Sequence, residues 1–435
     1  MAQRFSPIQL GIIVFFSLFI ALGLIFFSDK AGVGTSNKNK SIKITVWGTE
    51  NSEIMSEVLG NLEFTDQEIS IKYVEKEGST FVQDIVEAIA RGGAPDIVLV
   101  DDTNIWALKD LVYTTSYETY PERTFKDAFA DSGEIFLSKE GTLAFPVTID
   151  PFVMYWNKTI FAEKALPLPP VSWDEVVEIT PLLTKTTETG VITSSAVPFG
   201  RFENTSYPKT VLALLTSQAG GSFTVLDRED DQLKSGISSA NQTSRKALVG
   251  AINYFTAFSN PSLKIYTWNK SISYDENEFL SGRLALYFGY ASEAEILRKK
   301  NPNLNFDIAL VPKPEGSTVS YTIGRVKGLA IMKNSPNKDT ALTVIGEFLK
   351  DENLSSYTTI SGMPPAKRSL LKVKPADPYL SRFWNAALLS KSWIDPDKDA
   401  TYGVFSNAVS GVLNGFYTSE NAVSDISDKI DSLVK

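Results

Sequence analysis

Acidic side chains come directly after two apolar segments, and these are the first residues whose positions suggest chemistry. Asp101 and Asp102 follow the apolar run at residues 97–100, while Trp47 ends the run at residues 42–47 and Glu50 comes just after it. Both runs alternate with helical patterns, which predicts a parallel sheet whose ligands bind beyond the carboxyl ends of the strands. Carboxylates at that edge accept hydrogen bonds from ligand hydroxyls or bind a cation, and an indole supplies an apolar face.

Each of these residues also has a structural interpretation. One of the two aspartates is expected to cap a helix that begins at Thr103. Trp47 also fits a half-buried aromatic at the rim of the sheet. The sequence therefore leaves both a binding role and a structural role open at these two strand ends.

The composition excludes most metal and nucleophile chemistry. None of the 435 residues is cysteine or histidine, so disulfides, thiolate or imidazole metal sites and a Ser-His-Asp triad are impossible. The run Asp395-x-Asp397-x-Asp399 has calcium-loop spacing, but Ala400 and Ser406 stand where such a loop needs glycine and glutamate. No cofactor and no metal are therefore expected. The net charge of −9, without a basic block, argues against nucleic acid as a partner.

The segments that position these side chains belong to a chain long enough for two or three domains. Strands are predicted at residues 42–47, 69–74 and 97–100, and helices around residues 54–62 and from Thr80, which has capping-box spacing to Gln83. The later elements are a strand and loop at residues 197–204, a buried strand ending at Tyr290, strands at residues 306–310 and 327–332, and helices at residues 210–217, 244–258 and 334–349.

Residues 145–185 organise the rest of the chain. The apolar, β-branched run at residues 145–156 contains one acid, Asp150, and predicts an extended segment that crosses the molecule. An Asn-Lys turn, a short helix and a proline-rich stop at residues 167–170 follow, and Ser172 and Glu175 then form a capping box. This order closely resembles the extracellular solute-binding proteins of ABC importers, in the branch that includes maltose-binding protein.

Further motifs occur in the order that is typical of the same family. They are A-P-D-I-V at residues 94–98, F-x-x-G-R-L-A-L at 279–286, V-P-K-P at 311–314, G-L-A-I followed by N-S-P-N-K at 328–338, G-M-P-P-A at 362–366 and T-S-E-N-A-V at 418–423. Each motif alone is weak, but their common order covers nearly all of the chain after residue 41.

The resemblance implies an α/β, two-lobed fold of the periplasmic-binding-protein-like type II class, with a hinge and a ligand cleft between the lobes. One N-terminal transmembrane helix would precede it. Lobe one would comprise residues 41–147 and 313–366, and lobe two residues 148–312 and 367–435. A ligand that binds the closed form better than the open form would close such lobes by hinge motion.

The resemblance also implies positions for ligand-binding residues. Asp150 lies where relatives carry an acid that binds a ligand hydroxyl, although it equally fits a capping acid at the hinge. Of Tyr155 and Trp156, one is expected to face the cleft and the other the core, because neighbours on an extended segment point in opposite directions. Arg325 is expected beside a crossing, where it would bind a carboxylate, a phosphate or hydroxyls, or pair with Asp150.

Aromatic residues are expected at the cleft in this family, because the apolar face of a sugar ring stacks on Trp or Tyr. Ser292 stands where sugar-binding relatives usually carry Trp, and Tyr290 could supply a stacking face nearby. Trp384 is assigned to the core. The complete set of predicted binding residues is Trp47, Glu50, Asp101, Asp102, Asp150, Tyr155, Trp268, Tyr290, Ser292, Arg325, Trp393 and Tyr402.

The N-terminal residues predict attachment to a membrane. Residues 8–27 form an apolar run of about twenty residues, long enough to span a bilayer as a helix. A cleavable signal peptide is the alternative, but the run is long for one and no small-x-small site ends it clearly. The sequence favours an uncleaved signal-anchor at residues 1–30 and a flexible linker at residues 31–41, with the folded part on the extracytoplasmic side.

The expected function is the capture of a small solute, above all a sugar or oligosaccharide, by a monomer that delivers it to the permease subunits of an ABC importer. No enzymatic activity is expected. Two other classes stay open: a membrane-anchored sensor or adhesion protein with the same fold, and a surface glycosidase that uses two carboxylates. Nothing in the sequence fixes a carboxylate pair at the separation a glycosidase needs. A neighbouring permease gene would distinguish transport from sensing.

Overall fold

The computed structural model describes residues 41–65, 68–318 and 320–434. Contacts divide the chain into two units. In the smaller unit, the described residues are 41–43, 64–65 and 68–70, and the Ile42 amide donates to the Glu68 carbonyl at 2.9 Å. The larger unit contains residues 44–63 and 71–435.

The predicted signal-anchor and nearly all of the predicted linker lie outside the described residues. Over residues 41–65, 68–318 and 320–434, no helix combines the length and the apolar character that a membrane crossing needs.

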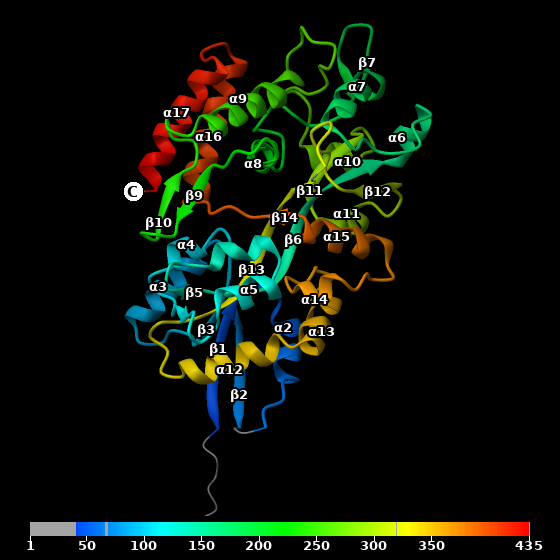
Figure 1. The fold of residues 1–435 in the computed structure, drawn as a ribbon. Helices are drawn as coiled ribbons and strands as arrows, with labels where there is room; N and C mark the ends of the chain where they lie inside the picture. Colours follow the sequence, from blue (N-terminus) through cyan, green and yellow to red (C-terminus); the bar gives the residue numbers. More distant parts are fainter. Residues whose placement is uncertain (1–40, 66–67, 319, 435) are drawn as a thin grey trace, which may run out of the picture. The chain divides into compact units, whose positions relative to one another are not determined.

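An eight-stranded sheet runs through the molecule (Figure 1) in the order β11-β6-β13-β3-β1-β2, with β12 paired to β6 and β14 to β13. The strands β1 and β3 are parallel, whereas β13 is antiparallel to both β3 and β6. The predicted strand–helix alternation at the start of the fold is therefore confirmed. The strands of this sheet are β1 (Ile42–Gly48), β2 (Ile69–Glu75), β3 (Ile97–Asp101), β6 (Phe145–Asn157), β11 (Leu286–Tyr290), β12 (Phe306–Ala309), β13 (Thr322–Ile331) and β14 (Ser390–Lys391).

The predicted crossing segment is a single strand, β6, that contacts different neighbours along its length. Its first half pairs with β13, from Phe145 opposite Leu329 to Pro151 opposite Gly324. Its second half lies between β11 and β12, both antiparallel to it. Along this strand only Asp150 is not buried. The apolar, β-branched segment thus forms a strand with both faces buried, as its composition predicts. Its one acid, Asp150, lies where the strand is partly exposed.

Helices pack around this sheet, and capping side chains fix where several of them begin. The Ser172 hydroxyl accepts from the Glu175 amide at 3.1 Å, and the Glu175 carboxylate accepts from the Val171 amide at 2.7 Å. This capping box is confirmed, whereas the Thr80 side chain makes no capping bond. The helices are α2 (Ser52–Gly60), α3 (Phe81–Ala90), α4 (Ile105–Leu108), α5 (Glu122–Ala128), α6 (Lys158–Glu163), α7 (Trp173–Leu183), α8 (Pro208–Gln218), α9 (Gln242–Ala257), α10 (Asp275–Leu280), α11 (Glu293–Lys300), α12 (Lys338–Phe348), α13 (Asp351–Ser361), α14 (Arg368–Leu371), α15 (Pro378–Leu388), α16 (Lys398–Leu413) and α17 (Ser419–Leu433), with a 3₁₀-helix at Asp131–Phe136.

Of the strand and loop predicted at residues 197–204, only the loop occurs. The segment is irregular with bends and a turn, and the bridge between Ser195 and Leu284 lies just before it. The Asn204 amide instead donates to the carbonyls of Asn269 and Ile272, both at 2.9 Å. Three short antiparallel strand pairs of the described residues lie outside the main sheet: β4 (Thr115–Ser116) with β5 (Gly141–Thr142), β7 (Lys185–Thr186) with β8 (Ile192–Ser194), and β9 (Thr224–Asp227) with β10 (Gln232–Ser235).

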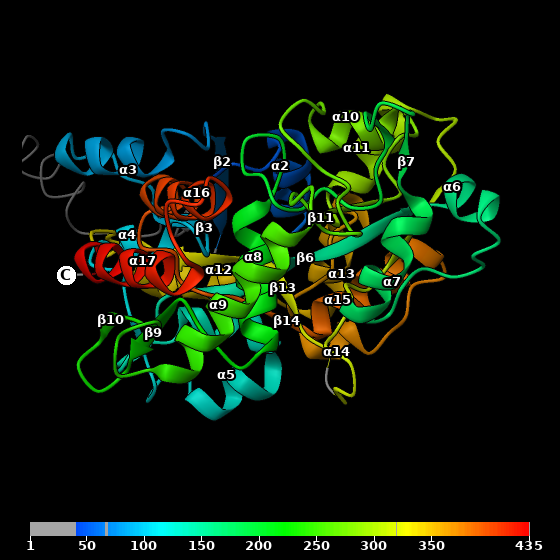
Figure 2. The same ribbon diagram turned by 90° about the horizontal axis from the view of Figure 1, so that it is seen from above.

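One aromatic core joins the second half of β6 to the helices around it. Trp173 stacks on Phe288 with ring centroids 5.8 Å apart, and Phe199 contacts Phe288 at 5.0 Å. The helices α8, α9, α16 and α17 pack against one another beside this core (Figure 2). The core therefore fixes the helices that follow β6 in the chain relative to that strand.

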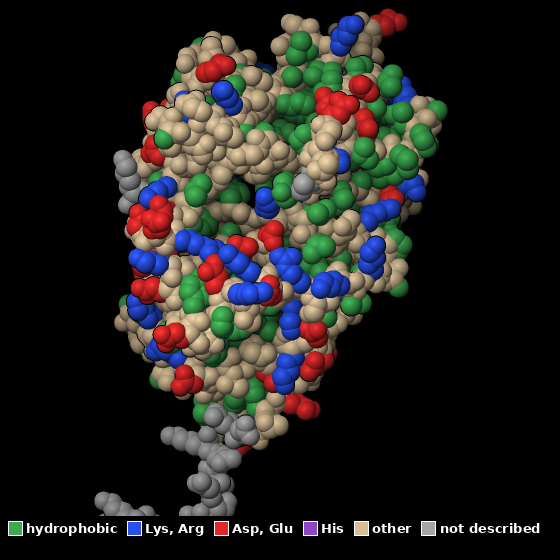
Figure 3. Space-filling view, in the orientation of Figure 1, with side chains coloured by type: hydrophobic (Ala, Val, Ile, Leu, Met, Phe, Trp, Pro, Cys, Tyr) green, Lys and Arg blue, Asp and Glu red, His purple; other side chains and the backbone are tan. Residues whose placement is uncertain are grey.

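The surface carries interleaved charges of both signs (Figure 3). Lys and Arg side chains gather over the region of α5, but acids lie among them. Arg228 pairs with Glu122, as does Lys126, and Arg368 pairs with Asp131. Several basic side chains on this face are thus paired with neighbouring acids.

Candidate ligand-binding cleft

A cleft of about 870 Å³ opens beside the middle of β6 and β13. Its floor follows from strand register: Arg325 lies opposite Asp150, and Lys327 lies opposite Thr148. Directly opposed residues of an antiparallel pair point to the same face, as do residues two apart on one strand. These four side chains therefore project together into the cleft, and the loops after β1 and β3 add Thr49–Asn51 and Thr103–Asn104 to its walls.

Asp150 contacts Ser292 rather than Arg325. The Asp150 carboxylate accepts from the Ser292 amide at 3.0 Å and from its hydroxyl at 2.6 Å. Burial raises the pKa of Asp150, and the two bonds from Ser292 oppose this rise. Both residues line the cleft, so the structure brings together these two predicted site residues.

The Arg325 guanidinium lies over an aromatic ring. It is 3.7 Å from the centroid of Tyr290 and 5.5 Å from that of Tyr207. Burial disfavours its charge, but Tyr290, Asp102, Tyr207 and Asp150 together raise the pKa of Arg325 above its ordinary value. The ring therefore holds a permanently charged group at the cleft surface.

The two aspartates after β3 differ in their surroundings. Asp101 lines the cleft, and its Oδ1 accepts from the Thr103 amide at 2.9 Å, the Thr103 hydroxyl at 2.7 Å and the Asn104 amide at 3.1 Å. These bonds close the turn that precedes α4, whose N-cap is Asn104 and has no side-chain capping bond, so the predicted capping of a helix by one of the pair is wrong. Asp102 has a buried Oδ1 without a hydrogen-bond partner among the described residues. Burial, reinforced by Asp101, raises the pKa of Asp102 to about 8.

The loop after β1 supplies Glu50, which forms an ion pair with Lys327. The Tyr73 hydroxyl anchors this loop: it accepts from the Glu50 amide and donates to the Glu50 carbonyl, both at 3.0 Å. Trp47 is half-buried under the Lys76 ammonium, 3.9 Å from its ring, and lies outside the cleft lining. Glu50 therefore belongs to the cleft. Trp47 is instead a half-buried aromatic residue outside the cleft, as its structural interpretation expects.

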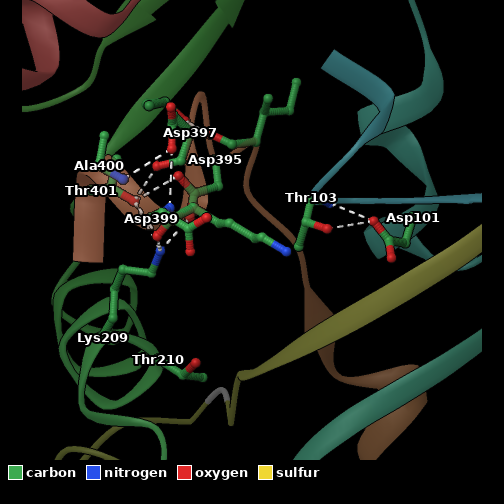
Figure 4. Close-up of polar contacts among 12 residues, drawn as sticks. Asp101, Thr103, Lys209, Thr210, Asp395, Asp397, Asp399, Ala400 and Thr401 are labelled. Atoms are coloured by element: carbon green, nitrogen blue, oxygen red, sulfur yellow. Dashed lines mark hydrogen bonds and ion pairs between the residues drawn. The ribbon is translucent and has the colours of Figure 1, made fainter. Parts of the chain in front are cut away.

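The opposite wall is the segment before α16 (Figure 4). There the Lys209 ammonium lies 2.5 Å from the Asp395 carboxylate, and Asp397 caps α16 by accepting from the amides of Asp399 and Ala400. Asp101 and Thr103 lie across the gap from this cluster. No group of three or more acids in the described residues could hold a metal ion. The spaced aspartates are thus a helix cap and an ion pair.

Most of the predicted aromatic residues lie away from the cleft. Tyr155 and Trp156 are both buried, so the expectation that one faces the cleft is wrong, because β11 and β12 flank β6 on both edges and packed side chains cover both faces. The Tyr155 hydroxyl donates to the Tyr290 carbonyl at 2.6 Å. Trp268 is fully buried and donates to Asn204 at 2.9 Å. Tyr290 itself is buried beneath Arg325.

The last two aromatic candidates also lie outside this cleft. Trp393 packs edge-on against Phe223 with centroids 5.3 Å apart and lines a separate cavity of about 240 Å³. Tyr402 is partly exposed, and its hydroxyl donates to the Phe202 carbonyl at 3.1 Å. Trp384, which the sequence assigned to the core, is buried.

Several cleft residues escaped the sequence analysis. Thr148 and Lys327 were recoverable from their positions, because each lies two residues from a predicted site residue on the same strand. Ser361, Met363 and the run at residues 396–399 also line the cleft. They lie far along the chain from the predicted residues of the cleft, and the spaced aspartates at 397 and 399 suggested a calcium loop rather than a ligand cleft.

The fold and the cleft define a protein that binds a small polar ligand beside two crossing strands. Residues 63–381 match the family profile described as bacterial extracellular solute-binding protein. The chain therefore belongs to the bacterial extracellular solute-binding proteins.

Relatives and solved structures of similar fold agree with this placement. Binding proteins of Brucella abortus (strain 2308) and Brucella suis biovar 1 (strain 1330) are 19% identical over 91% of this chain and 93% of their own. The cyclic α-maltosyl-1,6-maltose binding protein of Arthrobacter globiformis superposes with a TM-score of 0.72 at 17% identity, covering 91% of this chain and 99% of that one. A maltose/maltodextrin-binding domain of Bdellovibrio bacteriovorus bound to maltotriose gives 0.63 at 14% identity, covering 90% and 99%. An ABC transporter solute-binding protein of Thermotoga lettingae bound with α-D-tagatose gives 0.63 at 18% identity, covering 91% and 100%.

Proposed function

We propose that this protein is the extracytoplasmic substrate-binding component of an ABC importer and captures a sugar or oligosaccharide in the cleft. The observation that carries the proposal is the polar floor formed by Thr148, Asp150, Arg325 and Lys327 on adjacent strands. Carboxylates, a guanidinium and hydroxyls are the groups that bond sugar hydroxyls. The sugars named for the Arthrobacter, Bdellovibrio and Thermotoga proteins support the same ligand class.

The cleft would close by movement of two lobes about β6 and β13. The proposed division assigns residues 41–147 and 313–366 to lobe one, and residues 148–312 and 367–435 to lobe two. In support, the pairing partners of β6 change from β13 to β11 and β12 near Asp150. A solute that contacts both walls, at Asp101 and at Asp397, would bind the closed form better and so favour closure.

The test is thermal unfolding of the full-length chain, purified in detergent, against a panel of sugars. A sugar at 100 times its dissociation constant is expected to add about 2.7 kcal/mol to the free energy of unfolding. Stabilisation by one sugar class, without its chemical turnover, would support the proposal. Stabilisation by no sugar would contradict the sugar ligand, and hydrolysis of a bound sugar would contradict a pure binding function.

Asp150→Ala is expected to weaken binding of that sugar about tenfold or more, since it removes one charged acceptor and releases Ser292. Isothermal titration calorimetry measures the change. The matched control is Asp425→Ala, which removes an exposed carboxylate on α17. Unchanged affinity in the Asp150 variant would remove Asp150 from the binding site.

We also propose that residues 1–30 anchor the protein as a single transmembrane segment and that the folded part meets permease subunits at the membrane. The apolar run at residues 8–27 supports the anchor. The full-length chain is expected to stay in the membrane fraction after alkaline carbonate extraction, and a variant lacking residues 1–30 to be released. Release of the intact chain would contradict the anchor.

A further inference from the structure

We propose that the solute of this cleft is an acidic sugar whose anionic group is bound by Arg325. The inference rests on the proposed function, because it names the chemical class of the solute in the same cleft. Four features of the cleft carry it: the state of Arg325, the pairing of its neighbours, the lack of an exposed ring, and the free acceptors on the walls.

The Arg325 guanidinium contacts a tyrosine ring, but no described residue accepts a hydrogen bond from it. It lies over the Tyr290 ring, 3.7 Å from the centroid, and this contact uses none of its N–H groups in a hydrogen bond. Among the hydrogen bonds and ion pairs of residues 41–65, 68–318 and 320–434, none involves this guanidinium. A guanidinium presents donors in a rigid fork that matches the two oxygens of a carboxylate or phosphate. The side chain is therefore pre-arranged for a group that the protein itself does not supply.

The acids nearest to Arg325 are occupied or uncharged. Asp150, directly opposite on β6, accepts both bonds from Ser292 instead. Burial raises the pKa of Asp102 to about 8, so this carboxyl is mostly protonated at pH 7. Glu50 pairs with Lys327, which neutralises the next cation along β13. Lys398 also lines the cleft, but it is exposed on α16 and solvated. Of the two cations on the cleft floor, Arg325 is thus the one without an ion pair among the described residues.

The cleft offers no exposed ring for stacking. The aromatic residues in its described lining are Phe81 and Tyr357, which are 1% and 2% exposed. A neutral sugar would therefore lack the apolar contact that usually supplies much of its affinity. An anionic group that pairs with a desolvated guanidinium replaces that contribution, because charge-assisted bonds are about twice as strong as neutral ones.

The walls still provide acceptors for hydroxyl groups. Asp101 accepts its turn bonds and Asp397 its helix-capping bonds through Oδ1, so Oδ2 of each carboxylate remains available on either side of the cleft. A solute with several hydroxyls and one acid group fits this arrangement. The class is that of uronic acids, aldonic acids and sugar phosphates.

Calorimetric titration of the full-length chain tests the inference with matched ligands. Galacturonate and glucuronate are compared with galactose and glucose, and glucose 6-phosphate distinguishes a phosphate from a carboxylate. The acidic members of the pairs are expected to bind at least tenfold more tightly than the neutral ones. Arg325→Gln is expected to weaken binding of the acidic sugars about a hundredfold and to change binding of the neutral sugars little. Arg325→Lys is expected to retain part of the affinity for the acidic sugars.

Arg298→Gln is the matched control, since Arg298 also lies on a tyrosine ring, 3.9 Å from the Tyr379 centroid, but outside the cleft. It is expected to leave the affinity for every ligand unchanged, and circular dichroism checks that each variant is folded. Equal binding of neutral and acidic sugars, unaltered by Arg325→Gln, would overturn the acidic class and leave the proposed sugar-binding function intact. Binding of no sugar, neutral or acidic, would overturn both. Inorganic phosphate binding as tightly as the sugar acids would overturn the sugar part.

Discussion

Replacing Asp395 with alanine is expected to lower the free energy of unfolding by about 3–5 kcal/mol, the range for removing one partner of a buried ion pair. The Asp395 carboxylate is 7% exposed and the Lys209 side chain 15%, with 2.5 Å between their charged atoms. Asp395 also accepts from the Thr401 hydroxyl at 2.8 Å. The substitution leaves the Lys209 ammonium desolvated, with only the Lys398 carbonyl and the Thr401 hydroxyl as acceptors.

A double-mutant cycle separates the ion pair from the cost of an unpaired charge. Lys209→Met removes the cation while keeping an apolar stem, and the double variant is expected to be more stable than Asp395→Ala alone, because no buried charge remains. Urea unfolding gives all four free energies. The exposed pair Lys429 and Asp425 on α17 provides the control, with an expected loss below about 1 kcal/mol. Equal losses at the two pairs would show that burial adds nothing at Asp395.

The effect bears on the cleft because the pair secures its wall. Lys209 is on α8, whereas Asp395 precedes α16 and the cleft-lining residues 396–399. The pair thus joins one helix to the loop that carries the cleft-lining Asp397 (Figure 4). If that wall moves as a unit, the destabilised variant should also bind the solute more weakly, without any direct contact having been removed.

The elements of this fold were largely predictable because local physics decides them. The strands expected at residues 42–47, 69–74 and 97–100 occur as β1, β2 and β3 within one residue at each end. The Ser172 cap forms because its hydroxyl needs only the next turn of its own helix. The strand expected within residues 197–204 does not form, and the Asn204 side chain there bonds instead to the carbonyls of Asn269 and Ile272, far away in sequence.

The site was predictable only where strand register decides it. Asp150 and Arg325 lie side by side because β6 and β13 pair there, and their alternation also places Thr148 and Lys327 in the cleft. The aromatic candidates could not be placed in this way. Whether Tyr155 or Trp268 faces a ligand or the core depends on which elements cover it, and this is set by packing across the whole chain. The orphan oxygen of Asp102 likewise has no signature in sequence.

Glu293 is expected to make the stability of the protein decrease as the pH rises from about 5 to 8. Burial raises the pKa of this carboxyl from its ordinary 4.5 to about 7, even though Tyr207 and Tyr287 donate hydrogen bonds to it. Asp150 nearby raises the pKa further, and Arg325 lowers it. The folded state therefore keeps the proton in a range where the unfolded state has lost it. The resulting stabilisation is complete below pH 4.5 and is lost as the pH rises through about 7.

Glu293→Gln removes this dependence while keeping an acceptor for both tyrosine hydroxyls. Because the side chain is only partly buried, the wild-type protein is expected to lose about 2 kcal/mol through this group between pH 5 and 8, and the variant to lose correspondingly less. Burial also raises the pKa values of Asp102 and Asp275, to about 8 and about 6. These two groups contribute the same pH dependence to the free energy of unfolding of the wild-type protein and of the variant. The difference between the two unfolding curves at each pH therefore isolates Glu293. Parallel pH profiles would show that Glu293 ionises normally in the folded protein, and hence that its two tyrosine donors and local water compensate fully for burial.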